Sequence, residues 1–110
     1  MSLTEKKSVP CQGAMPPMTE VQAKVFLAQT PAWRLENNAT RITRKFECAD
    51  FVGAQVFVNK VGDLAEVEGH HPDISFGWGY AHIKIYTHKI MGLHENDFIL
   101  AAKIDKLLLK

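Results

Sequence analysis

Residues 69–73 of this chain read Gly-His-His-Pro-Asp, which places two histidines side by side directly before a proline. Imidazole titrates near neutral pH, so histidine side chains are suited both to donate and to accept protons. Pro72 pushes the preceding His71 toward an extended backbone, and we therefore expect the rings of His70 and His71 to point in different directions. The same residues are also compatible with a solvated polar loop that has no chemical role.

Acidic side chains precede these histidines. Glu66 and Glu68 fall in the last turn of a predicted helix, where the negative end of the helix dipole disfavours an acidic side chain by about 0.3–1 kcal/mol. The same dipole end, together with the Glu66 carboxylate, favours the protonated form of a histidine just beyond the helix. We therefore expect His70 to be suited to donate a proton, with Glu66 holding and charging its neighbour.

Two residues further along the chain could join this site. His88 ends a predicted strand, where folding could bring a third imidazole beside the loop. Asp97 could supply a carboxylate from the first turn of the last predicted helix, although capping and dipole complementarity alone also explain an acidic residue there. His82 shares the strand face of His88, and we interpret it as a surface or interface residue.

Other kinds of chemistry fit these residues less well. Adjacent His70 and His71 cannot easily aim at one ion, and no HxH or HExxH spacing offers two ligands on one face, so the sequence predicts no metal site. A nucleophilic mechanism needs a thiol or hydroxyl beside the histidines, and only folding could bring Cys48 there. Metal-free acid/base chemistry is the reaction type that these residues favour.

The rest of the sequence predicts the elements that would position this site. Residues 1–17 hold three prolines and are predicted to form an extended tail, followed by a single domain over residues 18–110. The predicted elements are a helix after Thr19, a hairpin around residues 37–39, a helix from Asp50 to Gly69, two strands joined near residues 77–79, and a helix from about His94. This order predicts an α+β fold, an antiparallel sheet with helices packed on one face.

Composition narrows the class of protein. The chain has 110 residues, room for one domain, and a formal net charge of +1, which gives no reason to expect nucleic acid as a partner. No secretion signal or membrane-spanning apolar run is apparent, so we expect a cytoplasmic protein with no membrane partner. Cys11 and Cys48 are far apart and are expected to be reduced thiols.

Together these residues resemble the signature of the pterin-4a-carbinolamine dehydratase family. The likeness lies in Glu66, the HHPD sequence at 70–73, Trp78, His88, and GLHENDF at 92–98 with its aspartate, and it extends from about residue 19 to the C-terminus. The resemblance implies a four-stranded antiparallel sheet with three helices on one face, in the order α-β-β-α-β-β-α. It also implies assembly as a homodimer or homotetramer.

The family's activity would be the dehydration of 4a-hydroxytetrahydrobiopterin to quinonoid dihydrobiopterin during tetrahydrobiopterin recycling, a hydro-lyase reaction with a pterin substrate and no cofactor. By resemblance, His70 and His88 form the acid/base pair, and His71 positions the pterin. Glu66 and Asp97 orient the imidazoles. A second function is implied as well, because some family members act as dimerisation cofactors of a homeodomain transcription factor; an exposed apolar helix face would favour that role.

The resemblance also implies residues that contact the substrate. Gly69 and the strand exit at Tyr86, Thr87 and Lys89 would contact the polar edge of the pterin. Trp78 would form an aromatic wall, or it would be a core residue. The sequence departs from the family pattern at Gly69, where relatives often have a polar residue, and at His94, which replaces a more usual Ser or Thr cap.

Overall fold

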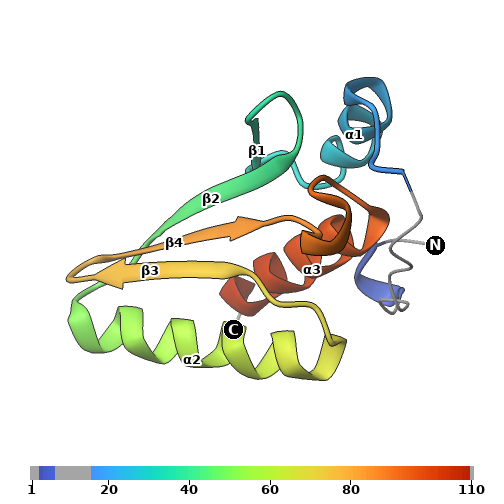
Figure 1. Cartoon of the computed structure of the whole chain (residues 1–110). Coiled ribbons are helices and arrows are strands. Elements are labelled where there is room, and N and C mark those ends of the chain that lie inside the picture. The colour runs from blue at the N-terminus through green and yellow to red at the C-terminus, as the bar shows by residue number, and fades with distance from the viewer. Residues whose placement is uncertain (1–2, 7–15, 110) are drawn as a thin grey trace.

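The computed structural model describes residues 3–6 and 16–109. Within them it contains three α-helices and one antiparallel sheet of four strands, in the predicted order (Figure 1). The helices are α1 (Glu20–Leu27), α2 (Phe51–Glu68) and α3 (Glu95–Lys106). The strands are β1 (Arg34–Glu36), β2 (Arg41–Glu47), β3 (Asp73–Gly77) and β4 (Tyr80–Ile85). Short 3-10 helices are η1 (Leu3–Glu5), η2 (His88–Ile90) and η3 (Leu107–Leu109).

The sheet has the strand order β1-β2-β4-β3, and every neighbouring pair is antiparallel. Helices α2 and α3 lie along the same face of this sheet, and α1 lies beyond β1 near the start of α3 (Figure 1). The rings of Phe26 in α1 and Phe98 in α3 stack with their centroids 5.6 Å apart. The opposite face of β3 and β4 carries polar side chains. The predicted α+β architecture is therefore confirmed.

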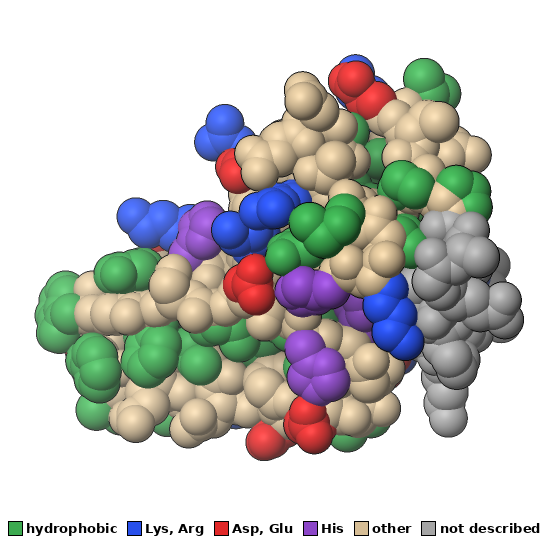
Figure 2. Space-filling view, viewed as in Figure 1, with side chains coloured by type: hydrophobic (Ala, Val, Ile, Leu, Met, Phe, Trp, Pro, Cys, Tyr) green, Lys and Arg blue, Asp and Glu red, His purple; other side chains and the backbone are tan. Residues whose placement is uncertain are grey.

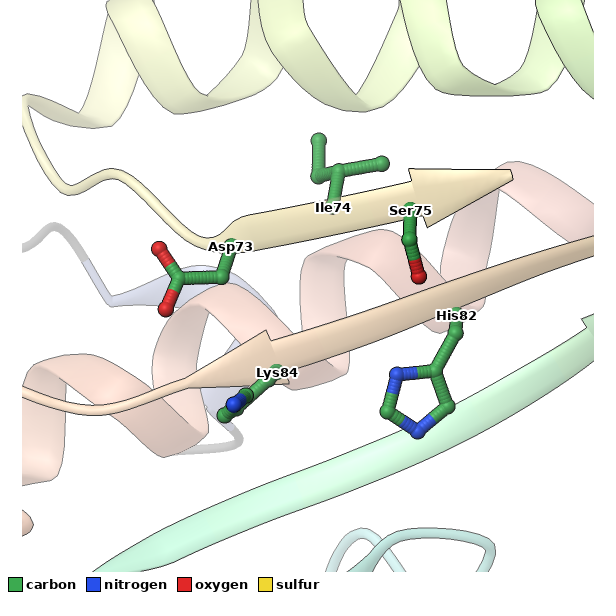
Figure 3. A pocket seen from close by; sticks show the side chains of 5 residues that line it. All are labelled: Asp73, Ile74, Ser75, His82 and Lys84. Atoms are coloured by element: carbon green, nitrogen blue, oxygen red, sulfur yellow. The ribbon is translucent and has the colours of Figure 1, made fainter.

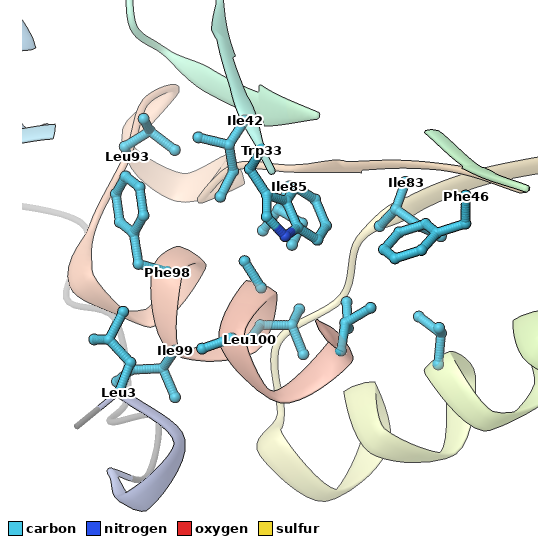
Figure 4. Close-up of a cluster of buried hydrophobic side chains, with 14 of the residues drawn as sticks. Leu3, Trp33, Ile42, Phe46, Ile83, Ile85, Leu93, Phe98, Ile99 and Leu100 are labelled. Atoms are coloured by element: carbon cyan, nitrogen blue, oxygen red, sulfur yellow. The ribbon is translucent and has the colours of Figure 1, made fainter. Parts of the chain in front are cut away.

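The hydrophobic core fills the space between the sheet and the helices (Figure 4). Ala81, Ile83 and Ile85 alternate along β4 and are fully buried, as the period of two in a half-buried strand requires. Ile42 and Phe46 of β2 lie on the same face and are also buried. His82 and Lys84, which alternate with these residues in β4, point to the other, open face of the sheet. Arg44 of β2 shares the face of Ile42 and Phe46 and reaches Asp105 of α3.

The predicted ends of α2 are confirmed. The Asp50 side chain accepts a hydrogen bond of 2.7 Å from the Gly53 amide, which satisfies one of the free N–H groups of the first turn. Gly69 ends the helix in the left-handed region with φ of 65°, a conformation that is unfavourable for residues with a Cβ. The chain then turns back toward the sheet, which brings His70 to Asp97 at the start of α3.

The N-terminal segment corrects one expectation. Residues 1–17 were expected to form an extended tail, but residues 3–5 form η1, and Leu3 is only 2% exposed against Ile99 of α3 (Figure 4). Lys6 also forms an ion pair with Glu95 in the first turn of α3. A single leucine in one helical turn leaves no periodicity in the sequence, which is why the pattern could not reveal this contact. The remaining tail residues, 7–15 with Cys11, lie outside the described residues.

Among residues 3–6 and 16–109, none of the helices combines the length and the apolar character needed to cross a bilayer. Cys48 is a free thiol, as expected.

Candidate active site

His70 forms the less exposed half of the site. Its Nε2 lies 2.5 Å from Oδ1 of Asp97, and the two side chains are 12% and 0% exposed. The other carboxylate oxygen of Asp97 accepts hydrogen bonds from the Thr87 hydroxyl at 2.9 Å and from the His94 amide at 2.8 Å. Both oxygens of the carboxylate are therefore held, so its orientation and that of the His70 ring are fixed by their surroundings.

Asp97 is placed there by the start of α3. His94 is the N-cap, its Nδ1 accepts a hydrogen bond of 3.1 Å from the Asn96 amide, and Asp97 is the reciprocal partner of this capping box. The positive end of the helix dipole and the hydrogen-bond donors offset the cost of burying a carboxylate. Capping and contact with a histidine were alternative explanations for Asp97 on sequence grounds, and in the structure it makes both interactions.

His71 forms the exposed half of the site. Its Nε2 lies 2.5 Å from Oε2 of Glu66, and these side chains are 61% and 77% exposed. The rings of His70 and His71 thus face different carboxylates, as the effect of Pro72 on the backbone predicts. Glu66 does lie beside a histidine just beyond the helix, but this histidine is His71 and not His70, because the chain turns at Gly69 and carries His70 away from Glu66 toward α3.

His88 provides the third imidazole. It begins η2, directly after Thr87. Because the Thr87 hydroxyl donates to Asp97, the residue before His88 is connected to the His70–Asp97 pair. Its Nε2 lies 3.9 Å from Oδ1 of Asp73, the first residue of β3, and its ring centroid is 4.2 Å from that of Tyr86. Histidine side chains gather on this part of the surface, beside acidic and basic groups (Figure 2).

The residues expected to contact the pterin divide into three groups. Gly69, Tyr86 and Lys89 flank the histidines in the sequence and lie at the same end of the sheet. Thr87 is buried, its hydroxyl is used by Asp97, and its backbone N–H donates to the Gly92 carbonyl at 2.8 Å, so it positions the site. Trp78 lies in the β3–β4 turn, 73% exposed, about 17 Å along the strand from Asp73, and the fold does not bring it to the histidines of its own chain.

Residues missed by the sequence reasoning lie on the open face of the sheet. Asp73 lies beside His88. It also lines a shallow depression together with Ile74, Ser75, His82 and Lys84 (Figure 3). The alternation of Asp73 and Ser75 in β3 and of His82 and Lys84 in β4 could have placed these side chains on one face. Their meeting depends on the register of the hairpin, which the sequence did not define.

Within residues 3–6 and 16–109, no three side chains of His, Cys, Asp or Glu form a group suited to hold a metal ion. The nitrogens Nε2 of His70 and His71 each face a separate carboxylate, which is the arrangement expected of proton-transfer and hydrogen-bonding groups.

The family comparison agrees with this fold. Residues 16–107 match the model of the family described as pterin 4 alpha carbinolamine dehydratase. The chain therefore belongs to that family.

Individual relatives cover nearly the whole chain. A protein of Halorhodospira halophila, named "Putative pterin-4-alpha-carbinolamine dehydratase", is 56% identical over 107 residues, which are 97% of this chain and 98% of the relative. A protein of the same name from Methylococcus capsulatus is 53% identical over 106 residues, with 96% of this chain and 93% of the relative covered.

Solved structures give the same fold. The "transcriptional coactivator/pterin dehydratase" of Brucella melitensis superimposes with a TM-score of 0.77 at 26% identity, over 83% of this chain and 97% of that one. A "pterin dehydratase-like protein" described as a RuBisCO assembly factor in the alpha-carboxysome gives a TM-score of 0.60 at 25% identity, over 69% of this chain and 88% of that one.

Proposed function

We propose that this protein dehydrates 4a-hydroxytetrahydrobiopterin to quinonoid dihydrobiopterin and water, as a step in tetrahydrobiopterin recycling. The observation that carries the proposal is the buried His70–Asp97 pair, whose carboxylate is also held by the residue preceding His88. Asp97 and Thr87 thereby connect His70 to the residue that precedes His88. Membership of the dehydratase family and the names of its relatives support the same reaction class.

The reaction needs one proton donor and one proton acceptor. The bond between C4a and the hydroxyl oxygen breaks as an acid protonates the leaving oxygen, and a base removes the proton from N5 while the N5=C4a double bond forms. Water leaves, the acid has lost one proton and the base has gained one, so the protonation states reset by exchange with solvent. We assign these two roles to His70 and His88 as a pair.

The other site residues bind the pterin or orient the imidazoles. Asp97 orients the His70 ring. In this proposal His71, which faces solvent with Glu66, contacts the pterin, and Gly69, Tyr86 and Lys89 contact its polar edge. Because His70 and His71 are each directed at their own carboxylate, we propose that the enzyme works without a metal or any other cofactor, and that exhaustive chelation leaves turnover unchanged.

The test is the decay of freshly generated 4a-hydroxytetrahydrobiopterin, followed with and without purified protein. We expect the parent to accelerate decay, and His88→Ala to lower turnover by about two to four orders of magnitude, the range for a lost acid or base. Thermal unfolding of the variant serves as the control for an intact fold. A parent that does not exceed the spontaneous rate, or a His88→Ala variant with parental turnover, would contradict the proposal.

A protein-interaction role is the second candidate, and a separate observation favours it. Exposed apolar side chains gather where α2 begins and where the β3–β4 hairpin turns, at the left of Figure 2. They are Phe51, Val52, Val56, Phe76, Trp78 and Tyr80. Such a patch fits self-assembly as a homodimer or homotetramer, or contact with a partner as a coregulator. Two solved relatives are named for a coactivator and an assembly-factor role.

Sedimentation of the parent and of a Val52→Asp/Val56→Asp variant would test this candidate. We expect the parent to sediment as a dimer or tetramer and the variant to dissociate, because two charges would be placed in the contact. A parent that is monomeric at all concentrations, with no partner recovered through the patch, would leave the dehydratase as the sole proposed function.

A further inference from the structure

The depression on the open face of the sheet is formed by two rows of facing side chains. Asp73 of β3 is opposite Lys84 of β4, and Ser75 is opposite His82, so four polar residues form a compact square in antiparallel register. Figure 3 shows these four side chains on the open face, whereas Ile74 points to the other side of β3, toward α2. The depression therefore has a polar rim over a sheet whose other face is the core.

This depression is continuous with the candidate active site. Asp73 belongs to both, because its Oδ1 lies 3.9 Å from Nε2 of His88 while its side chain lines the depression. Lys84 lies two residues before Tyr86, whose ring contacts that of His88. From Asp73 to Ser75 the strand advances about 7 Å, so the depression extends away from His88 by roughly that length.

The side chains of this depression have hydrogen-bonding capacity to spare. Ser75, His82 and Lys84 make no side-chain hydrogen bond or ion pair with any other residue among 3–6 and 16–109. By contrast Thr43, on the neighbouring strand β2, donates its hydroxyl to Glu36 at 2.9 Å. The free groups comprise an ammonium that donates, and a hydroxyl and an imidazole that each donate and accept, beside the accepting Asp73 carboxylate.

This mixture of groups favours a neutral ligand with several hydroxyls. A phosphate or carboxylate would be attracted by Lys84 but repelled by Asp73, and an ammonium would face the opposite conflict. A hydroxyl, which both donates and accepts, can satisfy Asp73 and Lys84 in turn. The residues thus match a short polyhydroxylated chain better than a charged group.

The position of the depression relative to the proposed reaction connects it to the substrate. In a pterin, C6 is bonded directly to N5, the atom that loses its proton in the proposed dehydration. A substituent on C6 therefore begins one bond from the reacting atoms, which must lie at the histidines. We propose that the depression of Asp73, Ser75, His82 and Lys84 binds the hydroxylated side chain on C6, so that the enzyme selects pterins with a polyhydroxyalkyl substituent. This inference rests on the proposed dehydratase function.

A pair of substrates tests it. The first is the 4a-hydroxy adduct of tetrahydrobiopterin, whose C6 side chain has two hydroxyls, and the second is the adduct of the analogue with a methyl group at C6. We expect the ratio of kcat/KM for the first to that for the second to fall about three- to tenfold in Ser75→Ala and in Lys84→Met, the range for a lost exposed hydrogen bond. The control is Lys45→Met, which removes the same charge from the same sheet face outside the depression, and we expect an unchanged ratio.

The outcomes separate the two proposals. If the parent dehydrates both substrates and the variants keep its ratio, or if Lys45→Met changes the ratio as much as Lys84→Met, the depression does not select the side chain. If the parent dehydrates neither, the proposed function is wrong. Binding of dihydrobiopterin and of its methyl analogue to the same proteins would then decide the inference, and equal affinities of the two ligands for the parent would overturn it.

Discussion

Two histidine–carboxylate pairs, formed by neighbouring residues, have the same length and different surroundings. His70 lies 2.5 Å from Asp97, and His71 lies 2.5 Å from Glu66. Asp97 is fully buried and holds two further hydrogen bonds, whereas Glu66 is mostly exposed and its contact with His71 is open to water. A short distance alone therefore does not distinguish a positioning contact from a surface one.

The two pairs differ in the effective dielectric constant around them and in the conformational freedom of their side chains. A buried pair interacts in a medium of low effective dielectric constant, and its partners have no alternative arrangement. An exposed pair is screened by water and salt, and both side chains lose rotamer freedom when they meet. We therefore expect the first pair to determine turnover and the second to adjust substrate contact.

The largest expected effect comes from Asp97→Asn, which removes the charge and keeps the shape. We expect turnover to fall by about two to four orders of magnitude, because the His70 ring loses the carboxylate that accepts its hydrogen bond and orients it. The measurement is decay of the 4a-hydroxy pterin, with thermal unfolding as the check on the capping box. Turnover within tenfold of the parent would show that the buried pair is structural only.

The second prediction concerns η1, which stabilises the start of α3 and thereby the buried pair. We expect Leu3→Ala to lower the free energy of unfolding by about 2–5 kcal/mol, the range for truncating a buried leucine, as measured by urea unfolding. Turnover should fall with stability, because Asp97 lies two residues after Glu95, the partner of Lys6. A variant with parental stability would show that the contact of Leu3 with α3 contributes nothing to the fold.

The sequence predicted the helices, strands and caps well, because each has a local cause. Asp50 and Gly69 are signals that act within a few residues, and the alternation along β4 repeats at every second position. Leu3 had no such signal, because one buried residue in one turn has no period. Its burial follows from the position of α3, which is almost one hundred residues away in the sequence.

The site was predicted as a set of residues rather than as a set of contacts. His70, His71, His88, Glu66 and Asp97 all lie at one end of the fold, but the carboxylate beside His70 comes from 27 residues later and not from the preceding helix. Proximity in the sequence favoured Glu66 as the partner of His70, because the sequence does not show in which direction the chain turns at Gly69. Asp73 was missed for a similar reason, since its contact with His88 depends on the strand register.

Glu66→Gln is expected to have a smaller effect than Asp97→Asn. Because the pair with His71 is exposed, we expect turnover to fall by less than tenfold. The stability of α2 should be unchanged or slightly improved, since an acidic side chain is removed from the negative end of the helix dipole. Steady-state turnover and thermal unfolding measure both on the same protein. A loss as large as that of Asp97→Asn would remove the distinction between the two pairs.

Asp105, at the other end of α3, is intermediate in exposure between Asp97 and Glu66. Its Oδ1 accepts hydrogen bonds from Trp33 Nε1 at 2.8 Å and Arg44 Nη1 at 2.7 Å, and its side chain is 27% exposed. Burial raises the pKa of the Asp105 carboxyl above its ordinary 3.8, although the hydrogen bonds from Trp33 and Arg44 and the charge of Arg44 act in the opposite direction. The folded protein therefore holds this proton more tightly than the unfolded chain does.

The sign of the smallest prediction follows from this shift. As the pH falls from neutral through the raised pKa toward 3.8, the folded state takes up the proton first, so this group's contribution to stability increases, and it is lost again as the pH rises. Asp105→Asn cannot take up the proton, so its stability relative to the parent should decrease between neutral pH and about pH 4. Urea unfolding at both pH values measures the difference, with Asp63→Asn, an exposed aspartate of α2, as the matched control. The stability difference between Asp105→Asn and the parent could instead stay constant with pH, or move in favour of the variant on acidification. Either result would show that burial does not dominate the pKa of Asp105. A side chain that is 27% exposed would then behave like the screened carboxylate of Glu66.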